Sequence, residues 1–410
     1  MIIKKNLLLL LILPLIISCN NNDFDIWNSS LSSEYSFNQG ISFIDKCSDS
    51  NEPNSFNQTD CSLAKIDIEE SNDVYFVDMK KTYYSYLPGI FDYLKDDEPN
   101  IAKHFFEVDN QDYPVCIKWD SDSEDVVFIK IVYSLKNNYE DKTEIVLTPN
   151  ARFVYINNLY KNSTYYLKLI YCIDGIEKCI QTSFNTTDLG PRTMSIDGIY
   201  NVRDVGGYLT ESGRSTRQGL LFRGGALSKC IDSYYDKWVS LTDEGATCLR
   251  DNLCIKSDFD LRAKGENFGL ENSPIPDASI IYFAVPSYLG AFTLTEPYRK
   301  LFAELANEEN YPIYLHCTGG ADRTGTACFL LNALLGVKEL DLIHDYEFTS
   351  FSIYSYRSSQ ENGPYPFYEF YNELKEKYNG NSLSEKVENY LLSIGLTQQQ
   401  ILNIKTIMIE

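Results

Sequence analysis

The chain has 410 residues, 44% of them hydrophobic, which is enough for two or three domains that each bury a core of their own. Its formal net charge of −22 at pH 7 argues against nucleic acid and against anionic membrane surfaces as partners of the folded domains. A phosphate-bearing ligand would also be repelled at long range, so a site for one must be a local concentration of positive charge.

The N-terminal residues 1–19 have the pattern of an export signal. Lys4 and Lys5 form a basic start, and the apolar run Leu7–Ile17 is too short to span a bilayer as a helix. The sequence Ile16-Ile17-Ser18-Cys19 at its end resembles the lipobox of bacterial lipoproteins. This resemblance implies a lipoprotein signal peptide, with Cys19 acylated and the protein anchored by its lipid to a bacterial membrane, at the cell surface or in the periplasm. An ordinary cleaved signal peptide is the alternative.

Residues 20–65 are predicted to form a low-complexity tether, because the stretch after Cys19 is rich in Asn, Asp and Ser and cannot bury enough apolar surface to fold. In the domain predicted over 66–187, short runs alternate apolar and polar residues at intervals typical of a β-sandwich. These runs are Tyr113–Trp119, Val126–Tyr133, Glu144–Leu147, Phe153–Ile156, Tyr165–Tyr171 and Cys179–Phe184. The sequence Leu159–Tyr166 resembles the corner before the penultimate strand of fibronectin type III domains. This resemblance implies an all-β sandwich of that type with an N-terminal extension.

The cysteines leave several pairings open. The chain has 11 of them, and export would permit disulfides. Cys172 and Cys179 flank a predicted hairpin and would face each other across it if its loop has four residues; Cys47 and Cys61 are a second candidate pair. The cysteines lack the spacing of metal ligands and the chain has only 3 histidines, so we expect no metal and no cofactor.

After a hinge predicted at Thr186–Arg192, strand and helix patterns alternate. They lie at Leu220–Phe222, Thr242–Asn252, Cys254–Leu261, Ile280–Val285, Pro297–Ala306, Tyr311–Leu315 and Thr326–Leu335. This alternation predicts an α/β domain over residues 188–410 with a mainly parallel sheet. Sheets of this class bind ligands at the carboxyl ends of their strands.

The most informative part of the chain is the sequence His316-Cys317-Thr318-Gly319-Gly320-Ala321-Asp322-Arg323-Thr324-Gly325. It follows a predicted strand and precedes a predicted helix, so its backbone N–H groups lack partners and can converge on an anion such as phosphate. The helix N-terminus and Arg323 would stabilise the thiolate of Cys317, which becomes a nucleophile at neutral pH. The alternative is a buried structural cysteine, with Arg323 in a surface ion pair.

Each residue type in this sequence suits phosphate binding. The predicted phosphate-binding loop consists of Thr318, Gly319, Gly320, Ala321, Asp322 and Arg323. Its glycines permit positive φ and close approach of the main chain, and the planar guanidinium of Arg323 can hold two phosphate oxygens. The Thr324 hydroxyl would hydrogen-bond the sulfur and assist its departure from a phosphocysteine. We expect His316 to order the loop rather than to act as a base.

Several segments, in order along the chain, resemble the secreted bacterial tyrosine/serine protein phosphatases. They are Asn201–Tyr208, Gly219–Gly225, Asp258–Arg262 and His316–Gly325. The resemblance covers about residues 190–410 and implies a cysteine-dependent tyrosine phosphatase domain, in a family whose members act on phosphotyrosine, phosphoserine/threonine and phosphoinositides. Ala321 departs from the pattern, because members of this family often have a lysine there. The absence of a lysine at this position argues against phosphoinositides and other polyanions as substrates.

A general acid must protonate the leaving oxygen, and Asp260 and Asp322 are the candidates. Asp260 ends a predicted strand and would face the same end of the sheet as the loop, whereas Asp322 lies inside the loop. The resemblance allows either, and we favour Asp260 slightly. Both have structural alternatives: Asp260 could bind backbone amides or Arg262, and Asp322 could bind a main-chain amide of the loop. We expect Arg203 and Asp204 to form a buried ion pair.

Two functional hypotheses follow. In the first, the chain is an exported protein tyrosine phosphatase, with dual specificity as an extension, that hydrolyses phosphate monoesters through a phosphocysteine on Cys317. Phosphoinositides or inositol phosphates are alternative substrates. In the second, it is a non-catalytic surface lipoprotein that binds phosphorylated ligands. Cys317 and Arg323 together favour the first, because a binding protein needs no reactive thiol. The aromatic-rich segment Phe348–Tyr371 is expected to be helical core, and a lining of the approach to Cys317 is the alternative.

Overall fold

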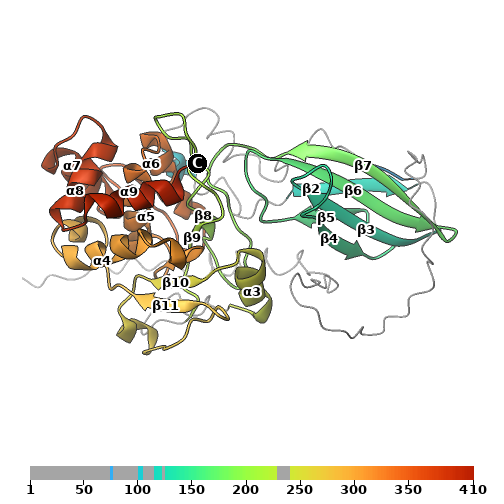
Figure 1. Cartoon of the computed structure of the whole chain (residues 1–410), viewed down its shortest axis with the longest axis horizontal. Helices are drawn as coiled ribbons and strands as arrows, with labels where there is room; N and C mark the ends of the chain where they lie inside the picture. Colours follow the sequence, from blue (N-terminus) through green and yellow to red (C-terminus); the bar gives the residue numbers. More distant parts are fainter. Residues whose placement is uncertain (1–73, 77–99, 105–114, 122–124, 229–240) are drawn as a thin grey trace, which may run out of the picture. The chain divides into compact units, whose positions relative to one another are not determined.

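The computed structural model of this protein describes residues 74–76, 100–104, 115–121, 125–228 and 241–410 (Figure 1). The predicted signal peptide, Cys19, the tether, Cys47 and Cys61 lie outside these residues. Within the described ranges, no helix combines the length and the apolar character needed to cross a bilayer.

The described residues before residue 190 form two antiparallel sheets. One has the strand order β1-β2-β5 and the other β4-β3-β6-β7. The strands are β1 (Val74–Phe76), β2 (Val115–Ser121), β3 (Val126–Ser134), β4 (Thr143–Leu147), β5 (Phe153–Ile156), β6 (Thr164–Ile173) and β7 (Ile176–Asn185), with a 3-10 helix, η2 (Ile101–His104), between β1 and β2 in the chain. Strands β2 to β7 overlap the runs whose alternation predicted strands.

One hydrophobic cluster draws on both of these sheets. It includes Trp119 of β2, Ile131 of β3 and Leu167 of β6, all of them buried. Near the start of β6, the hydroxyl of the buried Tyr165 accepts a hydrogen bond of 2.9 Å from the backbone N–H of Tyr160. A tyrosine bonded to the backbone a few residues upstream is a feature of immunoglobulin-like sandwiches. The relation to fibronectin type III domains stays a prediction.

The predicted facing of Cys172 and Cys179 is wrong. Strands β6 and β7 are joined by the tight turn Asp174–Gly175, whose φ angles are +52° and +74°. In this register Cys172 lies opposite Glu177 and Cys179 lies opposite Ile170, and the two form no disulfide. A loop of four residues would have placed the two thiols opposite each other. The two-residue turn sets a different register, in which they are not paired.

The second half of the chain contains a sheet of five strands with the order β11-β10-β12-β9-β8. They are β8 (Arg203–Asp204), β9 (Leu221–Gly224), β10 (Ser257–Asp260), β11 (Ser279–Tyr282) and β12 (Ile313–His316). The strands from β11 to β9 are mutually parallel, and the edge strand β8 runs antiparallel to β9. The predicted α/β architecture with a mainly parallel sheet is confirmed.

The same part of the chain contains seven described α-helices, α3 to α9. They are α3 (Asp243–Thr247), α4 (Thr295–Leu305), α5 (Asp322–Leu334), α6 (Glu339–Glu347), α7 (Phe367–Lys377), α8 (Leu383–Ser393) and α9 (Gln398–Met408). Helix α5 is buried along almost its whole length. Shorter turns are the π-helical η4 (Cys248–Asn252) and the 3-10 helices η5 (Lys264–Asn267), η6 (Tyr288–Phe292), η7 (Glu308–Asn310) and η8 (Phe348–Phe351). Helix α5 packs against α6 and α8 (Figure 1). Every residue from Thr324 to Leu334 is buried, as expected of a helix that is apolar around most of its circumference, so the loop at its N-terminus is firmly held.

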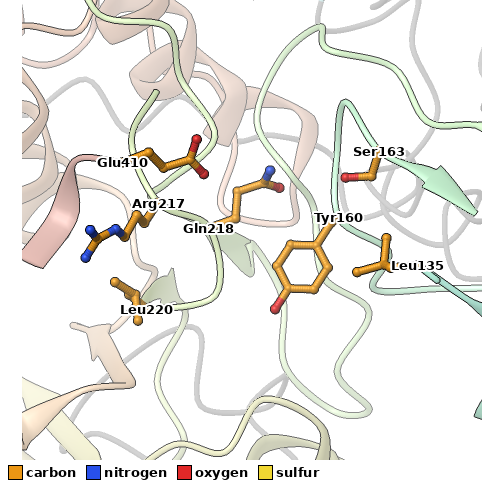
Figure 2. Close-up of a pocket in the computed structure, with 7 residues that line it drawn as sticks. All are labelled: Leu135, Tyr160, Ser163, Arg217, Gln218, Leu220 and Glu410. Atoms are coloured by element: carbon orange, nitrogen blue, oxygen red, sulfur yellow. The ribbon is translucent and has the colours of Figure 1, made fainter. Parts of the chain in front are cut away.

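A pocket of about 380 Å³ is lined by Leu135, Tyr160, Ser163, Arg217, Gln218, Leu220 and Glu410 (Figure 2). Its arginine is engaged with the backbone, since Arg217 Nη1 donates to the carbonyl oxygen of Ile407 at 2.9 Å. None of these lining residues belongs to the predicted phosphate-binding loop. The candidate site is a different pocket, at the carboxyl edge of the parallel strands.

Candidate active site

Cys317 directly follows the last residue of β12, and the loop that it begins ends at the start of α5. Parallel pairing places Asp260 of β10 and Gly224 of β9 level with His316. The loop therefore emerges at the carboxyl edge of the sheet. Ala321, at the N-cap position of α5, provides no side-chain cap. The first N–H groups of the helix are thus left for an anion.

The surrounding chain turns the carbonyl groups of the loop outward. The Thr318 carbonyl accepts a hydrogen bond of 2.9 Å from the backbone N–H of Ala226, and the Gly320 carbonyl accepts one of 2.7 Å from Arg223 Nη2. In a trans peptide the N–H points opposite to the C=O, so the N–H groups of these peptides face the pocket. Gly320 has a φ of +65°, and a Cβ there would lie 2.2 Å from the Gly224 carbonyl oxygen. Only glycine fits this approach.

Buried polar side chains form a network behind the loop. Arg203 and Arg223 both pair with the carboxylate of Asp345, Arg203 through an Nε to Oδ1 distance of 2.7 Å. Asn201 accepts from Arg203 at 2.6 Å and donates to the Gly319 carbonyl at 2.9 Å. Burial raises the pKa of Asp345, but the two guanidinium groups outweigh it and hold that pKa below its ordinary value. The network thus places two positive charges and one negative charge beneath the loop, which favours a bound anion.

The predicted ion pair between Arg203 and Asp204 is wrong. Asp204 pairs with Arg192, with Nη1 and Oδ2 2.8 Å apart. It also accepts hydrogen bonds from the backbone N–H groups of Gly206 at 2.8 Å and Gly219 at 2.6 Å. Adjacent residues of a strand point to opposite faces of the sheet. Arg203 therefore extends toward the loop network, whereas Asp204 organises the chain on the other face.

The Cys317 side chain is buried, and its surroundings favour ionisation of the thiol. Burial raises the pKa of Cys317, but the Arg323 guanidinium and hydrogen bonds from the hydroxyl and backbone N–H of Thr324 lower it, and the net result lies below the ordinary value. The Thr324 hydroxyl is buried and has the geometry of a hydrogen bond with no atom of the described residues, so it acts on the pKa of Cys317 through its closeness to the sulfur. The thiolate is the nucleophilic form of cysteine.

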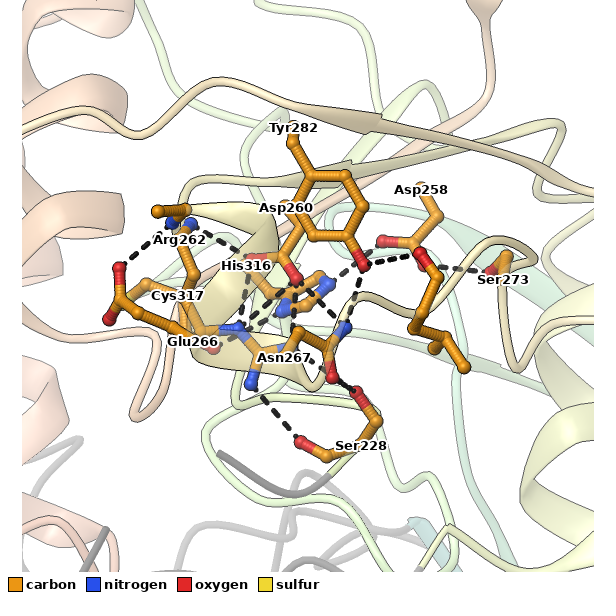
Figure 3. A network of polar contacts seen from close by, with 12 residues as sticks. Ser228, Asp258, Asp260, Arg262, Glu266, Asn267, Ser273, Tyr282, His316 and Cys317 are labelled. Carbon is orange, nitrogen blue, oxygen red and sulfur yellow. Dashed lines mark hydrogen bonds and ion pairs between the residues drawn. The ribbon is translucent and has the colours of Figure 1, made fainter. Parts of the chain in front are cut away.

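His316 links the start of the loop to β10. Its Nε2 lies 2.8 Å from Asp258 Oδ1, and its Nδ1 lies 3.1 Å from the carbonyl oxygen of Cys317 (Figure 3). Burial lowers the pKa of His316, but the nearby carboxylates of Asp260 and Asp258 raise it above the ordinary value. The protonated ring donates at both nitrogens. The ring therefore fixes the first peptide of the loop, as expected of a residue that orders the loop.

Asp260 is fully buried and bound to Arg262 (Figure 3). Arg262 Nε lies 2.9 Å from Oδ1 and Nη2 lies 2.8 Å from Oδ2, while the Arg262 backbone N–H donates to Oδ1 at 2.9 Å. Burial raises the pKa of Asp260, but His316 and Arg262 bring it below the ordinary value. Asp260 does not line the pocket that contains Cys317. Asp260 thus has the contacts of a structural carboxylate that binds Arg262 and a backbone amide, which was the alternative to a general acid.

The pocket above Cys317 has a volume of about 250 Å³. Its lining residues are Ser287, Cys317, Thr318, Gly319, Ala321, Asp322, Arg323, Tyr354 and Arg357. Arg323 Nη1 contacts the two carboxylate oxygens of Glu266 at 3.0 and 3.1 Å. The carboxylate of Asp322 is bound by Arg357 Nε at 2.8 Å and by the hydroxyl of Tyr288. The pocket thus combines a cysteine thiol, two guanidinium groups and a carboxylate.

Residues 194–410 match the profile of the tyrosine phosphatase family. The chain belongs to this family. A protein of Cupriavidus necator that is provisionally named a tyrosine-protein phosphatase is 30% identical to it over 175 residues. That match covers 38% of this chain and 63% of the relative, so the chain spans less than two thirds of the relative's length.

The pocket above Cys317 brings together most of the predicted site residues. Cys317, Thr318, Gly319, Ala321, Asp322 and Arg323 line it. Gly320 and Thr324 support the loop without lining the pocket, and Asp260 lies apart from it. Most aromatic residues of the segment Phe348–Tyr371 are buried in the core, although Tyr354 reaches the pocket wall.

Sequence reasoning missed Glu266, Tyr288 and Arg357. Glu266 comes from η5 and is 57 positions from Arg323, and Tyr288 comes from η6. Arg357 follows η8 and is 35 positions from Asp322. No motif connects these residues with the phosphatase loop. The signal that was available was weak: Arg357 lies within the aromatic-rich segment considered as an approach to Cys317.

Proposed function

We propose that this phosphatase hydrolyses phosphate monoesters, phosphotyrosine among them, through a phosphocysteine formed on Cys317. The observation that carries the proposal is a buried thiol with a lowered pKa at the N-terminus of α5. A thiolate surrounded by inward-facing amides and a guanidinium is suited to attack phosphorus held in the loop. A protein that only binds phosphorylated ligands would use the amides and Arg323 but would need no reactive thiol.

The proposed reaction has two steps. In the first, the Cys317 sulfur attacks phosphorus, the S–P bond forms, the P–O bond to the leaving group breaks, and the leaving oxygen takes a proton from a carboxylic acid. In the second, water attacks phosphorus, the S–P bond breaks, and the carboxylate takes a proton from the water. Arg323 and the loop amides stabilise the charge on the equatorial oxygens in both steps. The Thr324 hydroxyl stabilises the thiolate as it leaves.

We assign the general acid to Asp322 rather than to Asp260. Asp322 lines the pocket beside Cys317, and its side chain is 32% exposed. Asp260 is fully buried and does not line this pocket. A general acid must be able to reach the leaving oxygen, directly or through one water. The geometry therefore supports Asp322, whereas sequence analysis slightly favoured Asp260.

For the substrate we propose esters with a single phosphate, phosphotyrosine proteins first and phosphoserine/threonine proteins as an extension. Among the lining residues that the structure describes, both arginines face carboxylates: Arg323 pairs with Glu266, and Arg357 pairs with Asp322. Ala321 adds no charge. A second phosphate on the ligand would find no further cation in this pocket, which argues against phosphoinositides and inositol polyphosphates.

The test is hydrolysis of p-nitrophenyl phosphate and of a phosphotyrosine peptide by the purified full-length protein in the presence of a chelator. Cys317→Ser should lower turnover more than about 10³-fold, because a neutral hydroxyl replaces the nucleophile. Cys254→Ser, at an exposed cysteine outside the pocket, is the matched control and should keep full activity. Acid quenching during turnover should trap one phosphoryl group on the peptide that contains Cys317. Phosphate binding without turnover by the wild type would instead favour the non-catalytic alternative.

We also propose that the protein is exported and anchored through a lipid on Cys19, on the support of the basic start, the short apolar run and the lipobox-like sequence. In a bacterial host, metabolic labelling with a fatty acid should mark the wild type, and membranes should retain it. Cys19→Ser should lose both the label and the membrane retention. Unlabelled protein cleaved at another position would support the ordinary signal peptide.

The two antiparallel sheets support a further proposal, a fibronectin type III-like module over residues 66–187 that spaces the phosphatase domain, residues 188–410, from the membrane. Limited proteolysis should cut the hinge at Thr186–Arg192 and release a phosphatase domain that keeps its activity on p-nitrophenyl phosphate. Fragments whose ends lie inside either domain would contradict these boundaries.

A further inference from the structure

The carboxylate of Asp322 is held by two side chains. Arg357 Nε donates to Oδ1 at 2.8 Å and Nη2 donates to Oδ2 at 3.2 Å, and the Tyr288 hydroxyl donates to Oδ1. A guanidinium fork of this kind fixes both the position and the plane of a carboxylate. The Asp322 side chain is 32% exposed, whereas that of Arg357 is 4% exposed. The carboxylate therefore faces the pocket, with the guanidinium largely covered by protein.

The Nη1 group of Arg357 is bound by the main chain. Nη1 donates to the carbonyl oxygens of the successive residues 354–356, at 3.0, 3.3 and 3.1 Å. The guanidinium carbon also lies 3.8 Å from the centroid of the Tyr365 ring. Although Arg357 lines the pocket, its Nε, its Nη1 and one N–H of Nη2 are directed at the main chain and at Asp322. Its influence on a substrate would pass through Asp322 rather than through a direct contact with phosphate.

Tyr288 is fixed on the first turn of α5. Its backbone N–H donates to the Thr326 hydroxyl at 2.9 Å, and that hydroxyl donates to the Asp322 carbonyl oxygen at 2.8 Å. The Tyr288 hydroxyl lies 2.9 Å from the hydroxyl of Tyr346 in α6. The Tyr288 side chain could not follow a displaced carboxylate without breaking contacts with two helices.

We propose that Arg357 and Tyr288 are positioning residues that hold Asp322 toward the leaving oxygen and so determine how well the phosphatase cleaves esters with poor leaving groups. This inference rests on the function proposed above. When Asp322 gives its proton to the leaving oxygen, negative charge develops on its carboxylate, which the guanidinium and the phenol hydroxyl already face. Both contacts therefore strengthen in the transition state, which is what makes an interaction accelerate the reaction.

The test compares a good and a poor leaving group in the full-length protein. p-Nitrophenolate leaves with little need for proton transfer, whereas phenyl phosphate depends on a general acid. Arg357→Gln should lower kcat on phenyl phosphate about 10- to 100-fold, the range for a displaced catalytic group, and kcat on p-nitrophenyl phosphate less than about threefold. Arg299→Gln is the matched control, because this arginine forms an exposed pair with Glu296. It should change neither rate.

A double-mutant cycle with Asp322→Asn shows whether Arg357 acts through this carboxylate. Adding Arg357→Gln to Asp322→Asn should lower turnover of phenyl phosphate by no more than about a further twofold, since the two residues act as one unit. Arg357→Lys keeps the charge and should recover part of the activity. Tyr288→Phe should show the same dependence on the leaving group to a smaller degree, and it decides the case if Arg357→Gln does not fold.

Equal losses on the two esters, or full additivity with Asp322→Asn, would overturn the inference. This result differs from a failure of the proposed function, in which the wild type hydrolyses neither ester or Cys317→Ser stays active. An Asp322→Asn variant that affects the two esters equally would overturn the acid assignment and this inference together.

Discussion

The guanidinium of Arg223 donates a hydrogen bond of 2.7 Å to the carbonyl oxygen of Gly320, a residue 97 positions further along the chain. The bond orients the peptide after Gly320 so that its N–H faces the pocket. Because Asp345 binds the same guanidinium, the orientation of the loop depends on the charged network behind it as well as on its own sequence.

Arg223→Met should loosen the loop. We expect the free energy of unfolding to fall by about 1–3 kcal/mol, because the buried Gly320 carbonyl loses its partner and Asp345 loses one of two. Inorganic phosphate should inhibit about tenfold more weakly, which corresponds to about 1.4 kcal/mol of binding. Urea unfolding and inhibition of p-nitrophenyl phosphate hydrolysis measure the two effects. Arg250→Met removes an arginine from the exposed pair with Asp251 and should change neither value. Unchanged phosphate inhibition in Arg223→Met would contradict a role for this bond in anion binding.

The Cys317 thiol should ionise at a lower pH than an ordinary cysteine, whose pKa is about 8.5. The Arg323 charge and the Thr324 hydrogen bonds outweigh burial and lower its pKa, so the reactive thiolate should form at a lower pH than in an ordinary cysteine and decline as the pH falls through the depressed value. The rate of alkylation by iodoacetamide, followed on the Cys317 peptide by mass spectrometry, measures this. Arg323→Met should shift the profile to higher pH. A wild-type profile that matches N-acetylcysteine would remove the basis for a thiolate nucleophile.

The meeting of Cys317 and Arg323 in one pocket was predictable because the two residues are close in sequence. Cys317 and Arg323 lie on one short loop between a strand and a helix, and local backbone geometry alone brings such residues to one centre. The predictions failed where the strand register, or contact between residues distant in sequence, determines which side chains meet. Arg203 and Asp204 are sequence neighbours, but strand alternation sends them to different partners. Whether Cys172 and Cys179 lie opposite each other across the β6–β7 hairpin depends on the length of its turn.

The proposed general acid shows a second limit of sequence reasoning. Asp260 and Asp322 have the same chemistry and both lie near the end of a strand, so composition and spacing do not separate them. Packing does, because Arg262 encloses Asp260 while Asp322 opens into the pocket. Arg357, which holds Asp322, comes from a segment beyond α6 whose path depends on the whole core. Contacts of this kind are set by tertiary structure and leave no local pattern.

His316 should keep its proton above the pH at which an ordinary histidine, with a pKa of about 6.5, loses it. Burial lowers its pKa, but Asp260 and Asp258 raise it above the ordinary value. A raised folded-state pKa means that the charged pair stabilises the fold fully below the unfolded value, and that this contribution is lost as the pH rises through the folded value. The chain has 3 histidines, so NMR can resolve this titration. Asp258→Asn should bring the midpoint of His316 down. A wild-type midpoint at or below about 6.5 would contradict the pairing.

Ala321→Lys should give the phosphatase pocket an additional cation. Ala321 lines the pocket, where the two arginines already face Glu266 and Asp322. A charge pair at about 4 Å is worth about 1–4 kcal/mol between bulk water and a protein surface, so we expect kcat/KM for an inositol polyphosphate to rise at least about tenfold. Activity on a phosphotyrosine peptide should change less than about threefold, because its single phosphate already occupies the loop.

Ala321→Met separates the charge of the new side chain from its length. Ala321 is buried, so any long side chain at this position has to extend toward the pocket and could narrow it. If charge is what polyanionic substrates lack, the methionine variant gains nothing, and the gain of the lysine variant shrinks as salt rises from about 0.01 to 0.15 M and the Debye length falls from about 30 to 8 Å. Equal gains by both variants would assign the effect to shape. A lysine variant with no gain on the inositol polyphosphate would mean that the residue at position 321 does not determine substrate choice in this pocket.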